Sequence, residues 1–173
     1  VRITSSRSAW VVVAGILWVA APAAAVESKT RSVFYGDLHL HTSYSSDAVF
    51  LSGIRIGLDD AYRFARGEAV DYAGQSLRRA EPLDFIAVTD HAEQMGVGRR
   101  LYDATGPLAE TELSKKLRAG QQAPIAEVGR LFNSKQPIPG VDLGPILVEA
   151  WQAQMDAVDR YDRPGVFTTF LAY

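Results

Sequence analysis

The three histidines of this 173-residue chain stand where a metal ion could be held. His39 and His41 are two residues apart in a short β-prone run, so both side chains would leave one face of a strand with Cα atoms about 6.6 Å apart. Two imidazoles at that spacing can converge on one metal ion. His91 follows Asp90 directly after a second apolar run. Because sites in parallel α/β folds form at the carboxyl ends of strands, all three histidines are expected at one edge.

A carboxylate extends this candidate ligand set. Asp47 lies six residues beyond His41, after the polar, turn-prone run TSYSS. Nitrogen and carboxylate ligands without a thiolate suit Zn, Mn or Fe, and open sites of this kind are more often hydrolytic than structural. Taken singly, each motif has a simpler explanation as hydrogen-bonded histidines or as a turn. Their joint occurrence favours a metal site formed by His39, His41, Asp47 and His91.

The elements that must position these residues follow from apolar patterning. Three short runs rich in apolar residues predict strands, and the second is apolar enough to be buried on both faces. Two further segments have helical content, and each ends before glycine or Pro-Gly. The predicted strands cover 33–41, 83–89 and 167–173, and the predicted helices cover 58–66 and 145–161. This order predicts an α/β fold with parallel strands, either an open sheet or a barrel.

Two details of this pattern can be checked in a structure. The helix over 145–161 carries an apolar stripe at steps of four, four and three residues, formed by Leu147, Trp151, Met155 and Val158. The polar, charge-mixed region of about 93–144 predicts a helical insertion, because it is long for a connection within a compact α/β unit.

Composition excludes several classes of protein. With 18 Lys+Arg against 20 Asp+Glu the net charge is −2, which argues against a nucleic-acid partner. The absence of Cys removes disulfides, thiolate metal sites and cysteine nucleophiles.

The first 25 residues have the three parts of a secretory signal peptide. Arg2 and Arg7 precede an apolar run over 9–21, and small residues follow up to Ala25. A membrane anchor is the alternative, but the run is shorter than the roughly 20 residues that span a bilayer. We therefore expect cleavage after Ala25, export to the periplasm or the outside, and no stable membrane span in the remaining 26–173.

The motifs themselves resemble a known superfamily. The stretch GDLHLHTSYSSDA over 36–48 resembles the first motif of the polymerase and histidinol phosphatase (PHP) superfamily, and DFIAVTDH over 84–91 resembles its second motif. Together with the N-terminal segment and the closing FTTFLAY, they are similar to DUF3604, an uncharacterised family of exported PHP-like proteins.

This resemblance implies a distorted (β/α)7 barrel with two or three divalent metal ions at the C-terminal edge of its strands, and hydrolysis of a small-molecule phosphoester. His39, His41, Asp47 and His91 match metal ligands of the two motifs. Asp37 and Asp90 would orient an imidazole or a water, and Asp90 is also the candidate acid/base residue. The later motifs of the superfamily are absent, so we expect the N-terminal portion of a barrel, inactive alone, whose activity belongs to a longer protein.

Two alternatives to a metal-dependent phosphoesterase remain. One is a non-catalytic module of the same fold that binds a metal or another ligand, although the intact histidine motifs favour an enzyme. The other is an amidohydrolase-like enzyme acting on C–O or C–N bonds, because His-x-His on a first strand also occurs there. Asp47 and the Thr-Asp-His sequence ending at His91 weigh against it.

Overall fold

The computed structural model describes residues 31–134 and 138–173. Val33–Tyr173 form one compact unit, and the unit before it, Val1–Ser32, lies almost wholly outside the described residues. The predicted signal peptide over 1–25 therefore lies outside the described residues as well. In the described ranges, no helix combines the length and the apolar character needed to cross a membrane.

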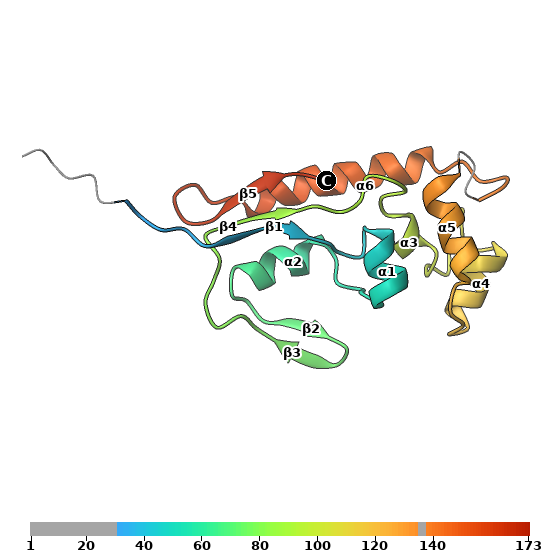
Figure 1. The fold of residues 1–173 in the computed structure, drawn as a ribbon, viewed down its shortest axis with the longest axis horizontal. Helices are drawn as coiled ribbons and strands as arrows, with labels where there is room; N and C mark the ends of the chain where they lie inside the picture. Colours follow the sequence, from blue (N-terminus) through green and yellow to red (C-terminus); the bar gives the residue numbers. More distant parts are fainter. Residues whose placement is uncertain (1–30, 135–137) are drawn as a thin grey trace, which may run out of the picture. The chain divides into compact units, whose positions relative to one another are not determined.

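A parallel sheet of three strands forms the centre of the compact unit (Figure 1). Its strands are β1 (Gly36–Leu40), β4 (Phe85–Val88) and β5 (Thr168–Leu171), with β4 in the middle and paired in parallel with both neighbours. The apolar sequence of β4 accounts for its central, buried place. The predicted α/β class with parallel strands is confirmed. Within the described residues the sheet is open, with β1 and β5 as its edges, and no barrel is closed.

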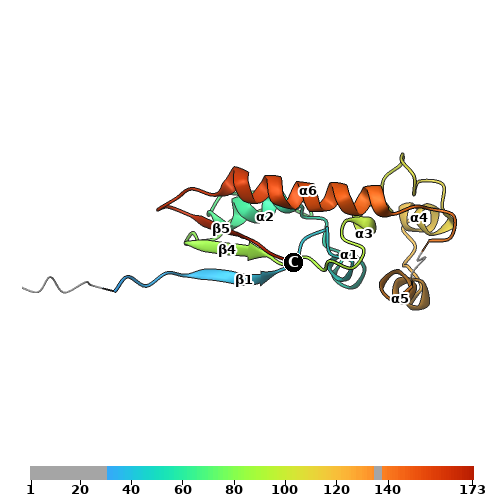
Figure 2. The same cartoon turned by 90° about the horizontal axis from the view of Figure 1, so that it is seen from above.

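Two helices pack on one face of this sheet, as Figure 2 shows. They are α2 (Leu58–Ala65) and α6 (Gly144–Tyr161), which begins with a proline in its first turn, where the missing N–H has no cost. The Tyr62 ring of α2 stacks on the Tyr161 ring of α6 with centroids 5.2 Å apart. The buried residues of this core are Leu58, Ala61, Tyr62, Ala65, Ile86, Val88, Ala157 and Phe167.

The buried face of α6 lies one residue before the predicted apolar stripe. Its buried residues are Ile146, Ala150, Gln154 and Ala157, whereas the predicted residues Leu147, Trp151, Met155 and Val158 are partly buried and flank them. Gln154 explains the difference, because its side-chain amide donates to the backbone oxygen of Val88 at 2.8 Å. A polar residue therefore occupies the centre of the face, and a pattern that counts apolar residues misses it.

A short antiparallel hairpin follows α2 and was not predicted. Its strands are β2 (Val70–Tyr72) and β3 (Gln75–Leu77), joined by Ala73 and Gly74. Both turn residues have positive φ, 52° and 77°, as a two-residue hairpin turn of the primed type requires.

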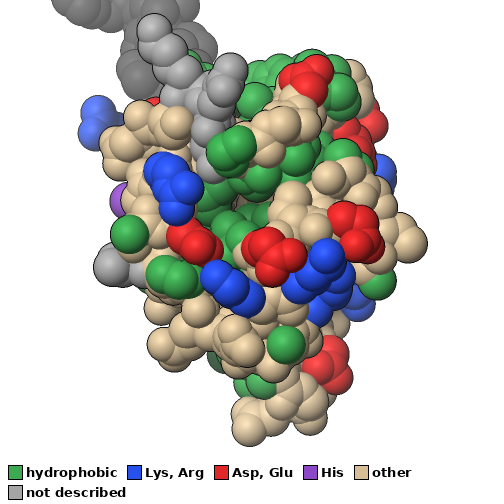
Figure 3. Space-filling model, turned by 90° about the vertical axis from the view of Figure 1, so that its right-hand side faces the viewer, with side chains coloured by type: hydrophobic (Ala, Val, Ile, Leu, Met, Phe, Trp, Pro, Cys, Tyr) green, Lys and Arg blue, Asp and Glu red, His purple; other side chains and the backbone are tan. Residues whose placement is uncertain are grey.

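In its described residues, the predicted helical insertion contains three helices and contributes to a second core. They are α3 (Val97–Arg100), α4 (Glu112–Arg118) and α5 (Ile125–Asn133). Figure 3 faces this end of the unit, where apolar side chains lie between charged ones. The buried residues of the second core are Val97, Leu101, Leu108, Leu117, Leu131, Ile138, Leu143 and Ile146. The boundaries of the insertion, 93–144, stay a prediction.

Candidate metal centre

Asp47 is positioned by a helix, α1 (Ser46–Ser52), rather than by the turn that the sequence indicated. It lies in the first turn of α1, where a carboxylate interacts favourably with the helix dipole. The helix ends at Gly53, whose φ of 67° gives the left-handed cap conformation. Helix α1 thus presents Asp47 beside the end of β1.

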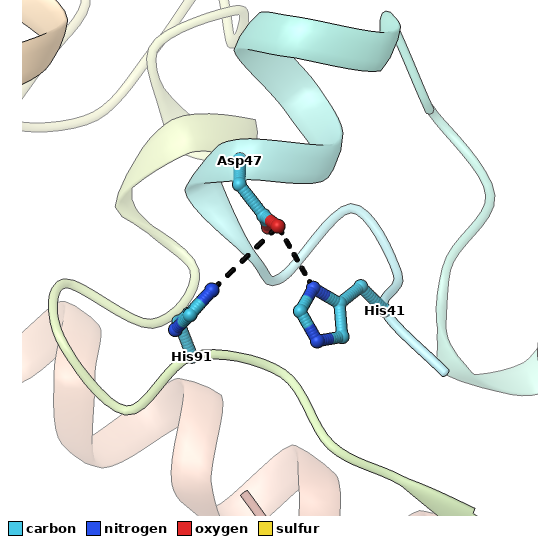
Figure 4. A group of neighbouring side chains, drawn as sticks. All are labelled: His41, Asp47 and His91. Atoms are coloured by element: carbon cyan, nitrogen blue, oxygen red, sulfur yellow. Dashed lines mark hydrogen bonds and ion pairs between the residues drawn. The ribbon is translucent and has the colours of Figure 1, made fainter. Parts of the chain in front are cut away.

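Three of the four predicted ligands meet at the carboxyl ends of β1 and β4 (Figure 4). The Nδ1 atom of His41 lies 2.9 Å from Oδ2 of Asp47, and Nε2 of His91 lies 3.6 Å from the same oxygen. One donor atom from each of the three side chains lies within 4.8 Å of the others. The edge expected from the sequence is therefore the place where these side chains come together.

His39 lies beside this cluster. Its ring centroid is 5.0 Å from that of His41, and the His41 centroid is 4.9 Å from that of His91. His39 is outside the group of three donor atoms, yet its side chain lines the same open pocket of about 580 Å³ as His41 and His91. The other residues lining the pocket are Leu38, Thr89, Ala92, Glu93 and Tyr173.

The environment of Asp47 favours its charged form. Partial burial raises the pKa of the carboxyl. Hydrogen bonds from Ser45, His41 and the backbone N–H of Ala48 together lower the pKa by more than burial raises it, so the net shift is downward. Oδ1 accepts from the Ser45 hydroxyl and from the Ala48 N–H, while Oδ2 faces His41. A charged carboxylate oxygen is therefore directed at the two imidazoles.

Asp90 is buried behind the cluster and holds the loop that follows β1. Its Oδ1 accepts the backbone N–H of Thr42 at 2.6 Å, and its Oδ2 accepts the Thr42 hydroxyl at 2.7 Å. Burial raises the pKa of Asp90, and these two hydrogen bonds offset only part of that effect. The contacts give Asp90 a positioning role through Thr42, and its predicted acid/base role stays a prediction.

Two other acidic residues lie near the cluster. The Asp37 carboxylate accepts the backbone N–H of His39 at 2.9 Å, a local contact within β1. Glu93 places Oε2 3.9 Å from Nδ1 of His91.

Ser45, like Thr42, is a residue at this site that sequence reasoning did not single out. Its hydroxyl donates to Asp47 and accepts the backbone N–H of His91 at 3.2 Å, so it touches both ligand-bearing segments. The available signal was its place two residues before Asp47 in the first motif, but serine is too common in turns for that place to be decisive.

The donor set fits a divalent transition metal. Ligands about 2.0–2.1 Å from a tetrahedral Zn lie roughly 3.3 Å from one another. The two spacings to Oδ2 of Asp47, 2.9 and 3.6 Å, bracket that value, and the donor atoms of the two imidazoles lie within 4.8 Å of each other. The His91 side chain is 47% exposed, so one side of the cluster is open to a small molecule. His41, Asp47 and His91 are the residues that would hold the ion, with His39 adjacent.

Comparison with known proteins gives a family for this parallel-sheet α/β protein with a His/Asp cluster. The family model described as protein of unknown function (DUF3604) matches residues 28–173, and the chain belongs to this family. Neither a curated protein nor a solved structure matches the chain. The resemblance to DUF3604 is thus confirmed, and membership of the PHP superfamily stays a prediction.

Proposed function

We propose that this protein is part of a metal-dependent hydrolase of the PHP type, which acts on a small-molecule phosphoester. The observation that carries the proposal is the convergence of His41, Asp47 and His91 within 4.8 Å at the carboxyl ends of parallel strands. Their donors are those of Zn, Mn or Fe sites, and a pocket beside them is open to solvent.

The proposed chemistry assigns separate tasks to the residues. A divalent ion at this place supplies a Lewis acid, which lowers the pKa of water and draws charge from a phosphoryl oxygen. Asp47 and the imidazoles of His41 and His91 would hold the ion. Asp90 fixes the loop after β1 through its two hydrogen bonds from Thr42. In the hydrolysis a water oxygen forms a bond to phosphorus and gives up a proton, the ester P–O bond breaks, and the leaving alkoxide takes up that proton to become an alcohol.

The larger architecture belongs to the same proposal. We propose a (β/α)7 barrel with two or three metal ions in a longer, exported protein. Among the described residues, the outer edges of β1 and β5 are unpaired in the sheet, and further strands of a barrel would pair there. The side chain of Phe170, on the sheet face opposite α6, is 46% exposed and would be buried inside a barrel.

The test is hydrolysis of a panel of phosphomonoesters and phosphodiesters by the purified longer protein that carries this chain, supplied with Zn, Mn or Fe. We expect metal-dependent release of phosphate or alcohol, and its loss in Asp47→Asn. The matched control is Asp159→Asn, the same substitution at an exposed position of α6, which should retain activity. Equal rates in the two variants would contradict the proposal.

The same panel separates the alternatives. Amides and lactones included beside the phosphoesters test the amidohydrolase-like reading. Metal binding without turnover of any substrate class, in the longer protein as well as in this chain, would instead favour the binding module.

A further inference from the structure

Ser45 joins the two segments that carry the metal-site residues. It is fully buried, at 0% exposure, in the short connection between β1 and α1. Its hydroxyl donates to Oδ1 of Asp47 and accepts the backbone N–H of His91 at 3.2 Å. A hydroxyl has one hydrogen to donate and two lone pairs, so one side chain satisfies both contacts.

The two oxygens of Asp47 have different surroundings. Oδ1 is occupied by Ser45 and by the Ala48 N–H at 2.6 Å, whereas Oδ2 is the oxygen near His41 and His91. Fixing Oδ1 fixes the plane of the carboxylate, and Oδ2 then faces the space between the imidazoles. The hydrogen bond to the His91 backbone holds the segment after β4 against the start of α1.

We infer that Ser45 is a positioning residue of the metal centre, which orients Asp47 and docks the backbone of His91 so that their donor atoms lie at ligand spacing. The inference rests on the proposed metal site. It goes beyond that site in assigning a role to a residue that is not itself a ligand. Outer residues that orient metal ligands typically contribute about 10–100-fold to metal affinity.

The neighbouring Ser46 provides a matched control. It is equally buried, at 0% exposure, but its hydroxyl has no hydrogen-bond partner among the described residues. Ser45→Ala and Ser46→Ala therefore remove the same atom from adjacent buried positions, and only the first removes contacts to the metal site.

The experiment is titration of the metal-free protein with Zn²⁺ by calorimetry and with Co²⁺ by visible absorption, which reports the ligand geometry. We expect Ser45→Ala to weaken Zn²⁺ binding about 10–100-fold and to change the Co²⁺ spectrum at saturation. Ser46→Ala should match the wild type in both measurements. Circular dichroism of each metal-free variant checks that the fold is retained.

The pair Ser45→Thr and Ser45→Val keeps the test decisive if Ser45→Ala unfolds. The two side chains have nearly the same shape and differ in the hydroxyl, so any overpacking is common to both. Tighter Zn²⁺ binding by Ser45→Thr than by Ser45→Val supports the inference, and equal binding overturns it. Equal binding by wild type and Ser45→Ala also overturns it, whereas a wild type that binds no metal contradicts the proposed function instead.

Discussion

At the scale of single residues, the buried Asp90 carboxylate gives a direct test of how the loop after β1 is held. Both of its oxygens accept hydrogen bonds from Thr42, and it is 0% exposed. We expect Asp90→Ala to lower the free energy of unfolding by about 1–3 kcal/mol, because it leaves the N–H and the hydroxyl of the buried Thr42 without their acceptor. Urea denaturation measures it.

The control for this substitution is Asp159→Ala at the exposed face of α6, which should change stability by less than about 0.5 kcal/mol. Equal stability of the two variants would show that the Thr42 contacts contribute nothing measurable.

Tyr62 makes stability depend on alkaline pH. Burial, and then the nearby charge of Asp90, raise its pKa above the ordinary value of 10.0. Below about pH 10 the folded and unfolded states both keep the phenol proton, but at higher pH the unfolded state loses it first, so the free energy of unfolding falls as pH rises. We expect this fall in denaturation curves measured across the alkaline range, and a smaller fall in Tyr62→Phe.

Tyr62→Phe has a second expected effect, at neutral pH. The Tyr62 hydroxyl is buried without a hydrogen-bond partner among the described residues, so its removal should stabilise the protein by about 1 kcal/mol. Tyr35→Phe, at a position 69% exposed, should alter neither property. A destabilised Tyr62→Phe would mean that the hydroxyl has a partner.

The candidate ligands were predictable from sequence to the extent that their residue types are rare. Histidine occurs three times in the chain, so its place at two strand ends was informative. Ser45 and Thr42 were not predictable, because hydroxyl residues are common in loops and their roles depend on partners 46 and 48 residues away. The sequence also could not distinguish His39 from His41, because that depends on how the side chains lie after the strand ends.

At the scale of elements, Gly96 controls how closely α3 approaches α6. Its φ is +78°, and a Cβ there would lie 2.8 Å from Cβ of Ala150. Gly53, with φ of +67°, has nothing within 4 Å of such a Cβ. Both alanine variants would bear the cost of a left-handed residue, roughly 1–2 kcal/mol, but only Gly96→Ala adds a clash, about 1–3 kcal/mol more. Thermal and urea denaturation of the two variants measure the difference.

Ala150→Gly provides the rescue for this prediction. In a double-mutant cycle it should recover part of the loss in Gly96→Ala, because it removes the atom that the new Cβ meets. Additive effects would contradict a direct contact between these two positions.

Sequence patterns predicted all three strands of the parallel sheet, β1, β4 and β5, and the two helices that pack on it, α2 and α6. Helix α1 and the hairpin of β2 and β3 were missed because they are short, and short elements depend on tertiary contacts. For α1 such contacts include the 2.7 Å hydrogen bond from the Gly96 N–H to the backbone oxygen of Tyr44. This bond joins the loop before α1 to the start of α3.

At the scale of the whole molecule, the proposed metal site predicts linkage between metal binding and stability. A ligand that binds only the folded state stabilises it by about 2.7 kcal/mol at a concentration 100 times its Kd. We expect Zn²⁺ to raise the Tm of the wild type and to have a much smaller effect on His91→Ala. A Zn²⁺-induced rise of the same size in both proteins would place the bound ion elsewhere.

The parallel α/β class was predictable for the whole molecule because strand and helix segments alternate along it. Closure into a barrel was not predictable from this alternation, because an open sheet has the same alternation of strands and helices. The described residues form three strands of the sheet.

The metal content of the purified protein, determined by elemental analysis after reloading with Zn or Mn, decides whether His41, Asp47 and His91 form a metal site. The wild type and Asp159→Asn are compared with Asp47→Asn and His91→Ala. We expect stoichiometric metal in the first two and its loss in the others. A wild type that stays metal-free after reloading would rule out the metal site and leave His41, Asp47 and His91 as a hydrogen-bonded cluster.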